Sequence, residues 1–415
     1  MDKTARKYFE RLGLPDKNIK LGSIKNKDIF VAIPCHNEAD IYKTIDSLSA
    51  SQRFCNTKVQ VVVAVNSHYE APNHIIEQNK RTLEYLNSLE NSSNFACHAI
   101  NISIDNKKEA GPGLARKVAM DSIVFQVCLQ GKDVVICSLD ADCQVSANYF
   151  AEINTFFTDK NNFASTIYFE HQLDELQSAK QKEGAMLYEL YMRYFFHASK
   201  HYGLPHPMYT VGSCFALRSS SYLKVGGMNK RIAGEDFYFL HSLTRLGKAG
   251  SINKTTIYPS ARTSDRVLFG TGPSIKNWMN GDETMLTSYP LLSFEALGKF
   301  WNIAEQLYSK NITEVEHTLE IHALEVLRFI RKNNKKLSKL VSISNSCTST
   351  DGFIRRLPTF FTALDQQRFL RDYKNCSAPQ NLMCEAKKLL ELMGQTKRLE
   401  DVAVLGAYRE LDRGV

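Results

Sequence analysis

The chain has 415 residues, of which 43% are hydrophobic and 23% charged, and a formal net charge of +8 at pH 7. This is the composition of a globular protein with a sizeable core, and it excludes a largely disordered chain. No apolar run reaches the roughly 18 residues that span a bilayer, and the first residues show no secretory signal. The positive charges are scattered, which favours a small anionic ligand or weak contact with anionic lipid over nucleic acid.

The ten cysteines form neither a CxxC pair nor a regular framework. Free cysteine is among the most buried residue types, so we expect reduced thiols rather than disulfides or a zinc site. This usage predicts a cytoplasmic protein, with association at the inner face of a membrane as the alternative.

The first 140 residues alternate between short apolar runs and amphipathic segments. The opening residues 1–14 favour a short amphipathic helix. Strands are expected at residues 28–33, 58–65, 97–104 and 132–139, and helices at 37–51, 74–89 and 112–130. Alternation at this pace predicts βαβ units, and hence an α/β fold with a mostly parallel central sheet.

Beyond residue 150 the alternation loosens. Helices are expected at 147–157, 178–202 and 234–247, and strands at 163–169, 213–218 and 249–259. From about residue 286 the apolar spacing is helical throughout. We therefore predict an N-terminal helical arm at 1–26, an α/β domain at 27–285 and a C-terminal helical region at 286–415.

Four polar clusters follow the predicted strands, at residues 34–38, 66–67, 109–113 and 140–142. In open α/β sheets, ligands bind outside the carboxyl ends of the strands. The sequence therefore predicts one ligand site that draws on all four clusters.

Asp140 and Asp142 are the most informative of these residues. If the backbone stays extended, side chains at i and i+2 point to the same side. Two neighbouring carboxylates repel each other unless a cation lies between them, and Mg²⁺ or Mn²⁺ is the natural partner because it prefers oxygen ligands. The alternative is an Asp-rich turn after a strand, which is common. His171, His197, His201 and His206 are candidates for a third ligand.

Two further segments carry charged side chains that suit a role in catalysis or in ligand binding. Glu235 and Asp236 begin a predicted helix, where acids suit the helix dipole, but a carboxylate there could also deprotonate a hydroxyl. Arg262 and Arg266 lie four residues apart, so an extended segment would present both guanidinium groups on one side, as a diphosphate clamp requires. The alternative for that segment is an exposed edge strand followed by a loop.

The motifs that carry a family resemblance are IPCHNE (33–38), VVVAVNS (61–67), EAGPGLARKVAMD (109–121), SLDADC (138–143), VGSCFALRSSSYLKVGGM (211–228) and AGED (233–236). With these motifs in this order, residues 27–260 resemble an inverting, nucleotide-sugar-dependent glycosyltransferase of family 2 with the GT-A fold, which is Rossmann-like. The resemblance implies a hexosyltransferase that uses a divalent metal, Mn²⁺ or Mg²⁺, and moves a sugar from a nucleotide-diphosphate sugar to an acceptor hydroxyl. UDP-sugars are the first candidate donors, and GDP-sugars the second.

The resemblance also implies roles for single residues. The DxD motif of the family corresponds to Asp140 and Asp142, with Asp140 near ribose and metal and Asp142 on the metal. Asp236 would be the catalytic base and Glu235 would help to bind the acceptor. The donor would contact residues from several motifs: Pro34, Glu38, Asn66, Gly113, Arg116, Gly212 and Ser213. Asn66 stands where the family often has an aspartate, which leaves recognition of the base open.

Other functions remain as alternatives. A dinucleotide-dependent oxidoreductase would place GxGxxG after the first strand, where this chain has IPCHNE. A nucleotidyltransferase also groups carboxylates around a metal. Retaining transfer, or a binding module without activity, would use the same type of fold.

Overall fold

The computed structural model describes residues 1–12, 21, 27–104, 111–231, 234–264, 266, 269–333, 335–375, 380–395 and 399–414. Glu109, Ala110 and Ala233, from the motifs quoted above, lie outside the described residues, as does most of the predicted arm after residue 12. By its internal contacts the chain forms two units. The first unit contains Met1–Ala185, Tyr209–Met279 and Glu410–Val415, and the second contains Met186–Met208 and Asn280–Arg409. The predicted domain boundaries at 26/27 and 285/286 stay a prediction.

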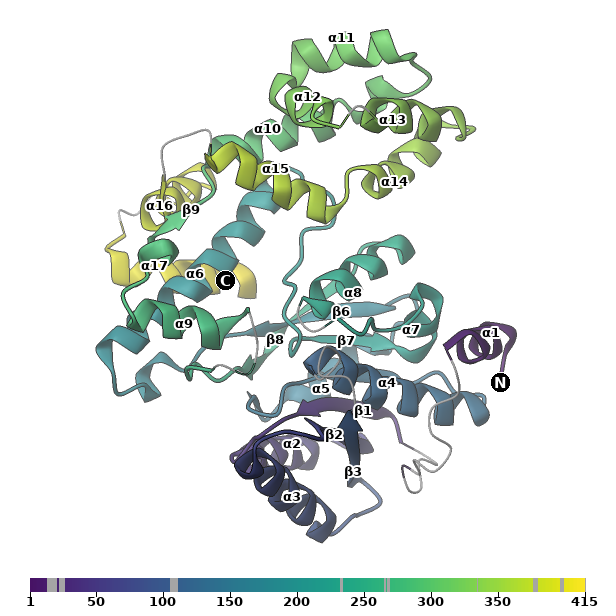
Figure 1. Ribbon diagram of the computed structural model, residues 1–415, viewed down its shortest axis with the longest axis vertical. Coiled ribbons are helices and arrows are strands. Elements are labelled where there is room, and N and C mark those ends of the chain that lie inside the picture. Colours follow the sequence, from purple (N-terminus) through teal and green to yellow (C-terminus); the bar gives the residue numbers. More distant parts are fainter. Residues whose placement is uncertain are drawn as a thin grey trace. The chain divides into compact units, whose positions relative to one another are not determined.

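The first unit contains an eight-stranded sheet, in the order β3-β2-β1-β4-β7-β6-β8-β5 (Figure 1). Its strands are β1 (Ile29–Cys35), β2 (Val59–His68), β3 (Phe95–Ile104), β4 (Val135–Ser138), β5 (Gln144–Val145), β6 (Ala164–Phe169), β7 (Phe215–Arg218) and β8 (Gly250–Tyr258). β3, β2, β1 and β4 are parallel to their neighbours in this series, and β6 is parallel to β8. β7 is antiparallel to both β4 and β6, and β5 is antiparallel to β8. The predicted α/β fold with a mostly parallel sheet is confirmed.

The central strands are buried along their whole length. Every residue of β1 and the first eight residues of β2 are buried, as expected for parallel strands covered on both faces. The sequence predicted that Pro34 would end the first strand, but β1 continues to Cys35. Proline is tolerated there because the pairing with β4 already ends at Ala32 and Ser138, so the missing N–H removes no bond on that side.

Helices connect and cover these strands. In the first unit they are α1 (Lys3–Leu12), α2 (Ile41–Arg53), α3 (Asn73–Ser88), α4 (Pro112–Leu129), α5 (Tyr149–Phe157), α7 (Ser219–Val225), α8 (Glu235–Leu243) and α9 (Thr271–Met279). α4 packs on β1 and β2, and α3 packs on β2 and β3. Pro112 occupies the first turn of α4, where its missing N–H costs nothing. None of the described helices is long and apolar enough to cross a membrane.

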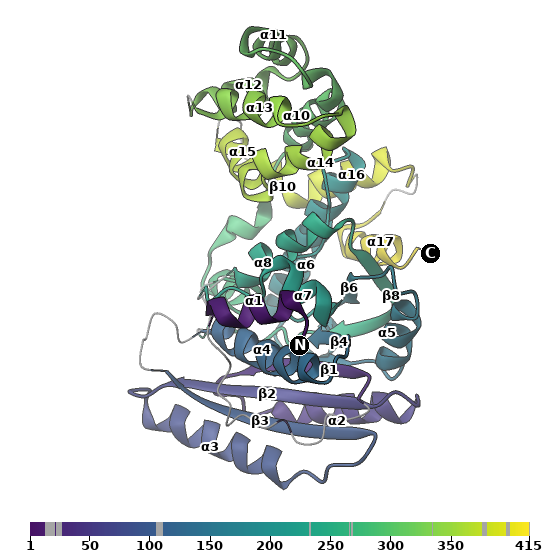
Figure 2. The same cartoon turned by 90° about the vertical axis from the view of Figure 1, so that its right-hand side faces the viewer.

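The predicted N-terminal helix is present as α1, and it packs against α4 and α7 (Figure 2). Tyr8 and Phe9 are buried on its inner face. The hydroxyl of Tyr8 donates to Asp121 Oδ1 at 2.7 Å, and Tyr222 donates to the same oxygen at 2.6 Å. Lys117 Nζ lies 2.8 Å from Asp121 Oδ2, so three elements share one carboxylate.

The second unit is mainly helical, which confirms the predicted C-terminal helical region. It contains most of α6 (Ala179–His201) and then α10 (Leu291–Asn302), α11 (Ile312–His322), α12 (Leu324–Arg331), α13 (Lys335–Asn345), α14 (Thr350–Phe360), α15 (Ala363–Asn375), α16 (Leu382–Leu392) and most of α17 (Asp401–Arg413). A two-stranded antiparallel sheet pairs β9 (Thr287–Ser288) with β10 (Gln380–Asn381). Two aromatic side chains of α6, the buried Tyr194 and the half-buried Phe195, pack on Phe294.

Candidate functional site

The sheet brings the described residues of the predicted polar clusters to one edge. β1, β2 and β4 are parallel, so their carboxyl ends lie on the same side. β1 ends at Cys35 and β4 at Ser138, while β2 extends past Cys35 to carry Asn66 beyond its neighbour. Asn66 is buried, and its carbonyl accepts from His36 Nδ1 at 2.7 Å.

Asp140 and Asp142 lie in a tight turn rather than on a continued strand. The amide of Cys143 donates to the carbonyl of Asp140 at 3.1 Å, and Thr44 Oγ1 donates to the carbonyl of Ala141 at 2.8 Å. The extended backbone assumed from the sequence is therefore wrong, and the Asp-rich turn is correct for the main chain. The two carboxylates consequently meet different guanidinium groups.

The first of these groups belongs to Arg116, on the first turns of α4. Its side chain is only 2% exposed. Nη2 donates to Asp140 Oδ1 at 2.5 Å, and Nη1 donates to Glu235 Oε1 at the start of α8. Burial opposes the charge on Arg116, but Asp140 and Glu235 outweigh it and raise the pKa of the guanidinium. One buried cation thus joins the DxD turn to the acidic helix start.

Two glycines make room for this bridge. A Cβ at Gly212 would lie 2.8 Å from Arg116 Nη2, so any larger residue would displace the guanidinium. A Cβ at Gly113 would collide with the carbonyl of Arg231 and lie 3.1 Å from Glu235 Cβ. Ser213 is buried beside Gly212, whose carbonyl accepts from Ser138 Oγ at 2.6 Å. Gly113 and Gly212 are therefore required for close packing around Arg116.

Asp236 follows Glu235 in the first turn of α8. Its Oδ1 accepts the amide of Phe237 at 2.7 Å. Burial, reinforced by the charge of Glu235, raises the pKa of Asp236 to about 6, while Arg116 opposes the shift. At neutral pH the carboxyl is therefore ionised yet close to the pH range in which it accepts a proton.

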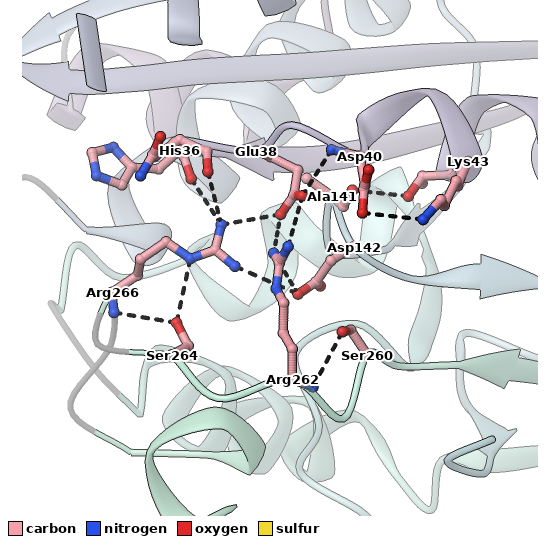
Figure 3. Close-up of polar contacts among 12 residues, drawn as sticks. His36, Glu38, Asp40, Lys43, Ala141, Asp142, Ser260, Arg262, Ser264 and Arg266 are labelled. Carbon is pink, nitrogen blue, oxygen red and sulfur yellow. Dashed lines mark hydrogen bonds and ion pairs between the residues drawn. The ribbon is translucent and has the colours of Figure 1, made fainter. Parts of the chain in front are cut away.

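A second charged cluster surrounds Glu38 (Figure 3). Arg262 Nη1 donates to Glu38 Oε1 at 2.9 Å, and its Nη2 contacts Glu38 Oε2 and also Asp142 Oδ2, the latter at 3.0 Å. Arg266 Nη1 donates to Glu38 Oε2 at 3.0 Å, and Nη2 lies 3.6 Å from Asp142 Oδ2. The structure thus places both guanidinium groups on the same two carboxylates.

The two carboxylates of this cluster differ in their pKa. Burial favours protonation of Glu38, but the hydrogen bonds and charges of Arg262 and Arg266 lower its pKa below the usual value. At Asp142 burial is the largest cause, and it raises the pKa to about 6 although Arg262 opposes it. Asp140 and Glu38 add to the rise, so the carboxylates of the turn and of the first loop act on one another.

The loop that follows β1 and contains Asn37 and Glu38 is hydrogen-bonded to α3. Asn37 has a positive φ of 49°, and its amide donates to Asn79 Oδ1 at 2.9 Å. Thr82 Oγ1 donates to the carbonyl of Glu38 at 3.2 Å. Pro34 is buried within β1 just before this loop. Asn79 and Thr82 were not predicted, although polar residues three apart on the inner face of a helix are a signal that could have revealed them.

Asp140 and Asp142 fit a hard divalent cation whose shell is completed by phosphate oxygens. Their side chains are 39% and 26% exposed, and each keeps one carboxylate oxygen that makes no hydrogen bond to the described part of the chain. Mg²⁺ is commonly held by one or two carboxylates together with substrate phosphates and water. The described residues contain no group of three or more His, Cys, Asp or Glu side chains that could hold a metal, so none of the four candidate histidines completes such a group.

No family model matches the chain, and no curated protein matches it in sequence. Among solved structures, S. aureus TarS 1-349 in complex with UDP matches with 13% identity, coverage of 90% of this chain and 94% of that chain, and a TM-score of 0.37. The mannosyltransferase PcManGT from Pyrobaculum calidifontis, in complex with GDP-Man and Mn²⁺, matches with 12% identity, coverage of 98% and 88%, and a TM-score of 0.36. GalNAc-T7 with UDP, GalNAc and Mn²⁺ matches with 13% identity, coverage of 71% and 55%, and a TM-score of 0.35. These TM-scores are low, and the function proposed below rests on the residues of this chain.

Proposed function

We propose that this protein is a glycosyltransferase that moves a sugar from a nucleotide-diphosphate sugar to an acceptor hydroxyl, with inversion at the anomeric carbon. One observation carries the proposal: the buried Arg116 guanidinium binds both Asp140 of the DxD turn and Glu235, the neighbour of Asp236. The acids of the DxD turn, proposed to bind metal and donor, and those at the start of α8, proposed to include the catalytic base, therefore belong to one charge network. The fold agrees with the resemblance to GT-A glycosyltransferases noted from the sequence.

The charge of the site suits a metal-bound diphosphate. The site has five carboxyl groups and three guanidinium groups, so it has two more acids than bases. The acids are Glu38, Asp140, Asp142, Glu235 and Asp236, and the bases are Arg116, Arg262 and Arg266. A Mn²⁺ or Mg²⁺ ion held by Asp140 and Asp142 would neutralise the charge that develops on the departing nucleoside diphosphate. Arg262 and Arg266 turn from Glu38 and Asp142 to the phosphate oxygens, where planar guanidinium groups bind well.

Asp236 acts as the general base. Its Oδ1 already accepts the Phe237 amide, so Oδ2 takes the proton of the acceptor hydroxyl. The hydroxyl oxygen forms its bond to the anomeric carbon as the bond to the diphosphate oxygen breaks on the opposite face. A positioned base of this kind contributes a factor of about 10²–10⁴ to the rate.

The other predicted residues are assigned around the donor. Pro34 and Asn66 shape the wall of the nucleoside pocket, and Glu38 positions the two arginines. Gly113 and Gly212 seat Arg116, so Arg116 positions the acids rather than contacting the donor, and Ser213 lies under the donor sugar. A UDP-sugar is the first candidate donor, and a GDP-sugar is the second.

A panel of UDP- and GDP-sugars, tested with Mn²⁺ or Mg²⁺ by thermal shift and by donor hydrolysis, tests the function. We expect at least one donor to raise the melting temperature only when metal is present. Asp142→Asn should abolish this response, whereas Asp174→Asn should keep it, because the Asp174 side chain is 99% exposed and forms an ion pair with Lys182.

If no donor in the panel gives a metal-dependent response, the proposal is contradicted. Release of pyrophosphate from a nucleoside triphosphate and a sugar 1-phosphate, with no sugar transfer from any nucleotide-diphosphate sugar, would identify a nucleotidyltransferase. The anomeric configuration of the product, measured by NMR, separates inversion from retention.

A further inference from the structure

An open cavity of about 510 Å³ lies in the first unit at the edge of the sheet away from the candidate site. It is lined where β1, β2 and β4 begin, by Lys27 and Asp28, by Lys58, and by Lys132 and Asp133. β1 has seven residues, which places its two ends about 20 Å apart. The cavity is therefore separate from the carboxylates that follow the same strands.

Positive charge dominates the lining. Four cationic side chains and two acidic ones face this space: Lys27, Lys58, Lys132, Arg218, Asp28 and Asp133. Asp133 is already occupied, since it accepts 2.9 Å hydrogen bonds from Ser219 Oγ, Ser220 N and Ser220 Oγ. One oxygen of Asp28 accepts the backbone amide of Lys58 at 2.9 Å. The acids are thus engaged with uncharged donors.

Within the part of the chain that the structure describes, none of the four cations of the lining forms an ion pair. Lys27 is only 6% exposed, and its ammonium group donates to the carbonyls of Ser92 and Ser93 at 3.4 and 3.0 Å. Arg218 donates to the carbonyls of Asn162 and Phe157 at 3.0 and 2.7 Å. Carbonyl groups satisfy hydrogen bonds without bringing charge. The ammonium groups of Lys58 and Lys132 form no ion pair or hydrogen bond with the residues that the structure describes.

Lys27 and Lys58 also repel each other. Burial lowers the pKa of Lys27, Lys58 lowers it further, and Asp28 only partly opposes this. Holding a buried ammonium group beside a second one is unfavourable unless an anion joins them. The cavity therefore combines fixed donors with an unbalanced positive charge.

We propose that this cavity is a second ligand site that binds the phosphate group of a small molecule, with the phosphate held by Lys27, Lys58 and Lys132. A volume of about 510 Å³ falls within the range of roughly 300–1,000 Å³ that is typical of small-molecule sites. Several lysines converging on one concave space suit a multiply charged oxyanion better than a single carboxylate. This site does not depend on the glycosyltransferase activity proposed above.

Lysine footprinting on the wild-type chain tests the proposal directly. The protein is acylated with and without inorganic phosphate or pyrophosphate, in the absence of divalent metal, and each lysine is quantified by mass spectrometry. We expect the anion to reduce labelling of Lys58 and Lys132 severalfold, with labelling of Lys80 unchanged because its side chain is 76% exposed on α3. Unchanged labelling of Lys58 and Lys132 at a concentration of ~10 mM anion, far above a Kd of ~1 mM, would overturn it.

Variants then separate this cavity from the candidate diphosphate site. In an Arg262→Gln/Arg266→Gln background, pyrophosphate should still bind, and adding Lys58→Gln/Lys132→Gln should weaken the binding at least about tenfold. The matched control is Lys80→Gln/Lys299→Gln, which removes the same charge from two exposed positions. Equal weakening by both pairs would show a general charge effect and overturn the proposal.

A second probe distinguishes a lipid headgroup from a water-soluble ligand as the source of the phosphate. Vesicles that contain phosphatidylglycerol are compared with pyrophosphate on the wild type and on the Lys58→Gln/Lys132→Gln variant. Retention on vesicles that is lost in the variant identifies a lipid headgroup as the ligand. Binding of pyrophosphate without retention on vesicles identifies a water-soluble ligand.

Discussion

Replacing Arg116 by methionine should destabilise the first unit, because it leaves the buried carboxylate of Glu235 without its cation. Asp140 is 39% exposed and can be solvated, but the side chain of Glu235 is only 6% exposed. Removing one partner of a buried ion pair costs about 3–5 kcal/mol, and we expect about 3 kcal/mol because only one of the two carboxylates is buried. At roughly 2–4 °C per kcal/mol in a large domain, the melting temperature should fall by roughly 6–12 °C.

The measurement is a thermal melt followed by circular dichroism at pH 8. The double variant Arg116→Met/Glu235→Met should recover most of the loss, since apolar residues of similar volume can replace a buried pair at little cost. A single variant that melts within about 2 °C of wild type, or a double variant no better than the single one, would refute the bridging role.

Three further predictions concern the same region. Asp236→Asn should slow sugar transfer by about 10²–10⁴-fold while the thermal shift produced by donor and metal stays unchanged; transfer at the wild-type rate would exclude Asp236 as the base. Because burial raises the pKa of Asp236 to about 6, the wild-type rate should fall about tenfold per pH unit below pH 6 and level off above it, and a flat profile from pH 4 to 8 would contradict this. Gly212→Ala should destabilise the protein by about 1–3 kcal/mol, because its Cβ would lie 2.8 Å from Arg116. At Gly406 in α17, an added Cβ would have no described atom within 4 Å apart from the local helix backbone. Gly406→Ala should therefore be neutral or stabilising in the same melt, and equal effects would rule out the packing explanation.

The local patterns of the sequence predicted the parallel half of the sheet well. Continuous apolar runs became β1 and β2, and the residues that follow them reached one edge. The antiparallel pairing of β7 was not predicted, because strand direction depends on contacts between segments far apart in the chain. The two-residue strand β5 was missed because two residues carry no periodicity.

The partners of the candidate site residues were harder to predict. Arg116 and Glu235 lie 119 positions apart, and Arg262 and Glu38 lie 224 apart. Residue types and spacing indicated that these side chains belong to one site, but they did not show which cation meets which acid. The contacts of the turn that contains Asp140 and Asp142 were equally hard to predict. An extended backbone would have aligned the two carboxylates, but in the turn Asp140 contacts Arg116 and Asp142 contacts Arg262.

The route of the chain between the two units has a practical consequence. The chain passes between them four times, and the first passage, between Ala185 and Met186, falls inside the continuous helix α6. A single proteolytic cut between Met279 and Asn280 would leave Met186–Met208 on the N-terminal fragment, although these residues belong to the second unit. The same cut would leave Arg413, which donates to Thr256 Oγ1 at 2.9 Å, on the C-terminal fragment. The two fragments should therefore stay associated after cleavage, which makes this connection a suitable position for a split-protein complementation assay.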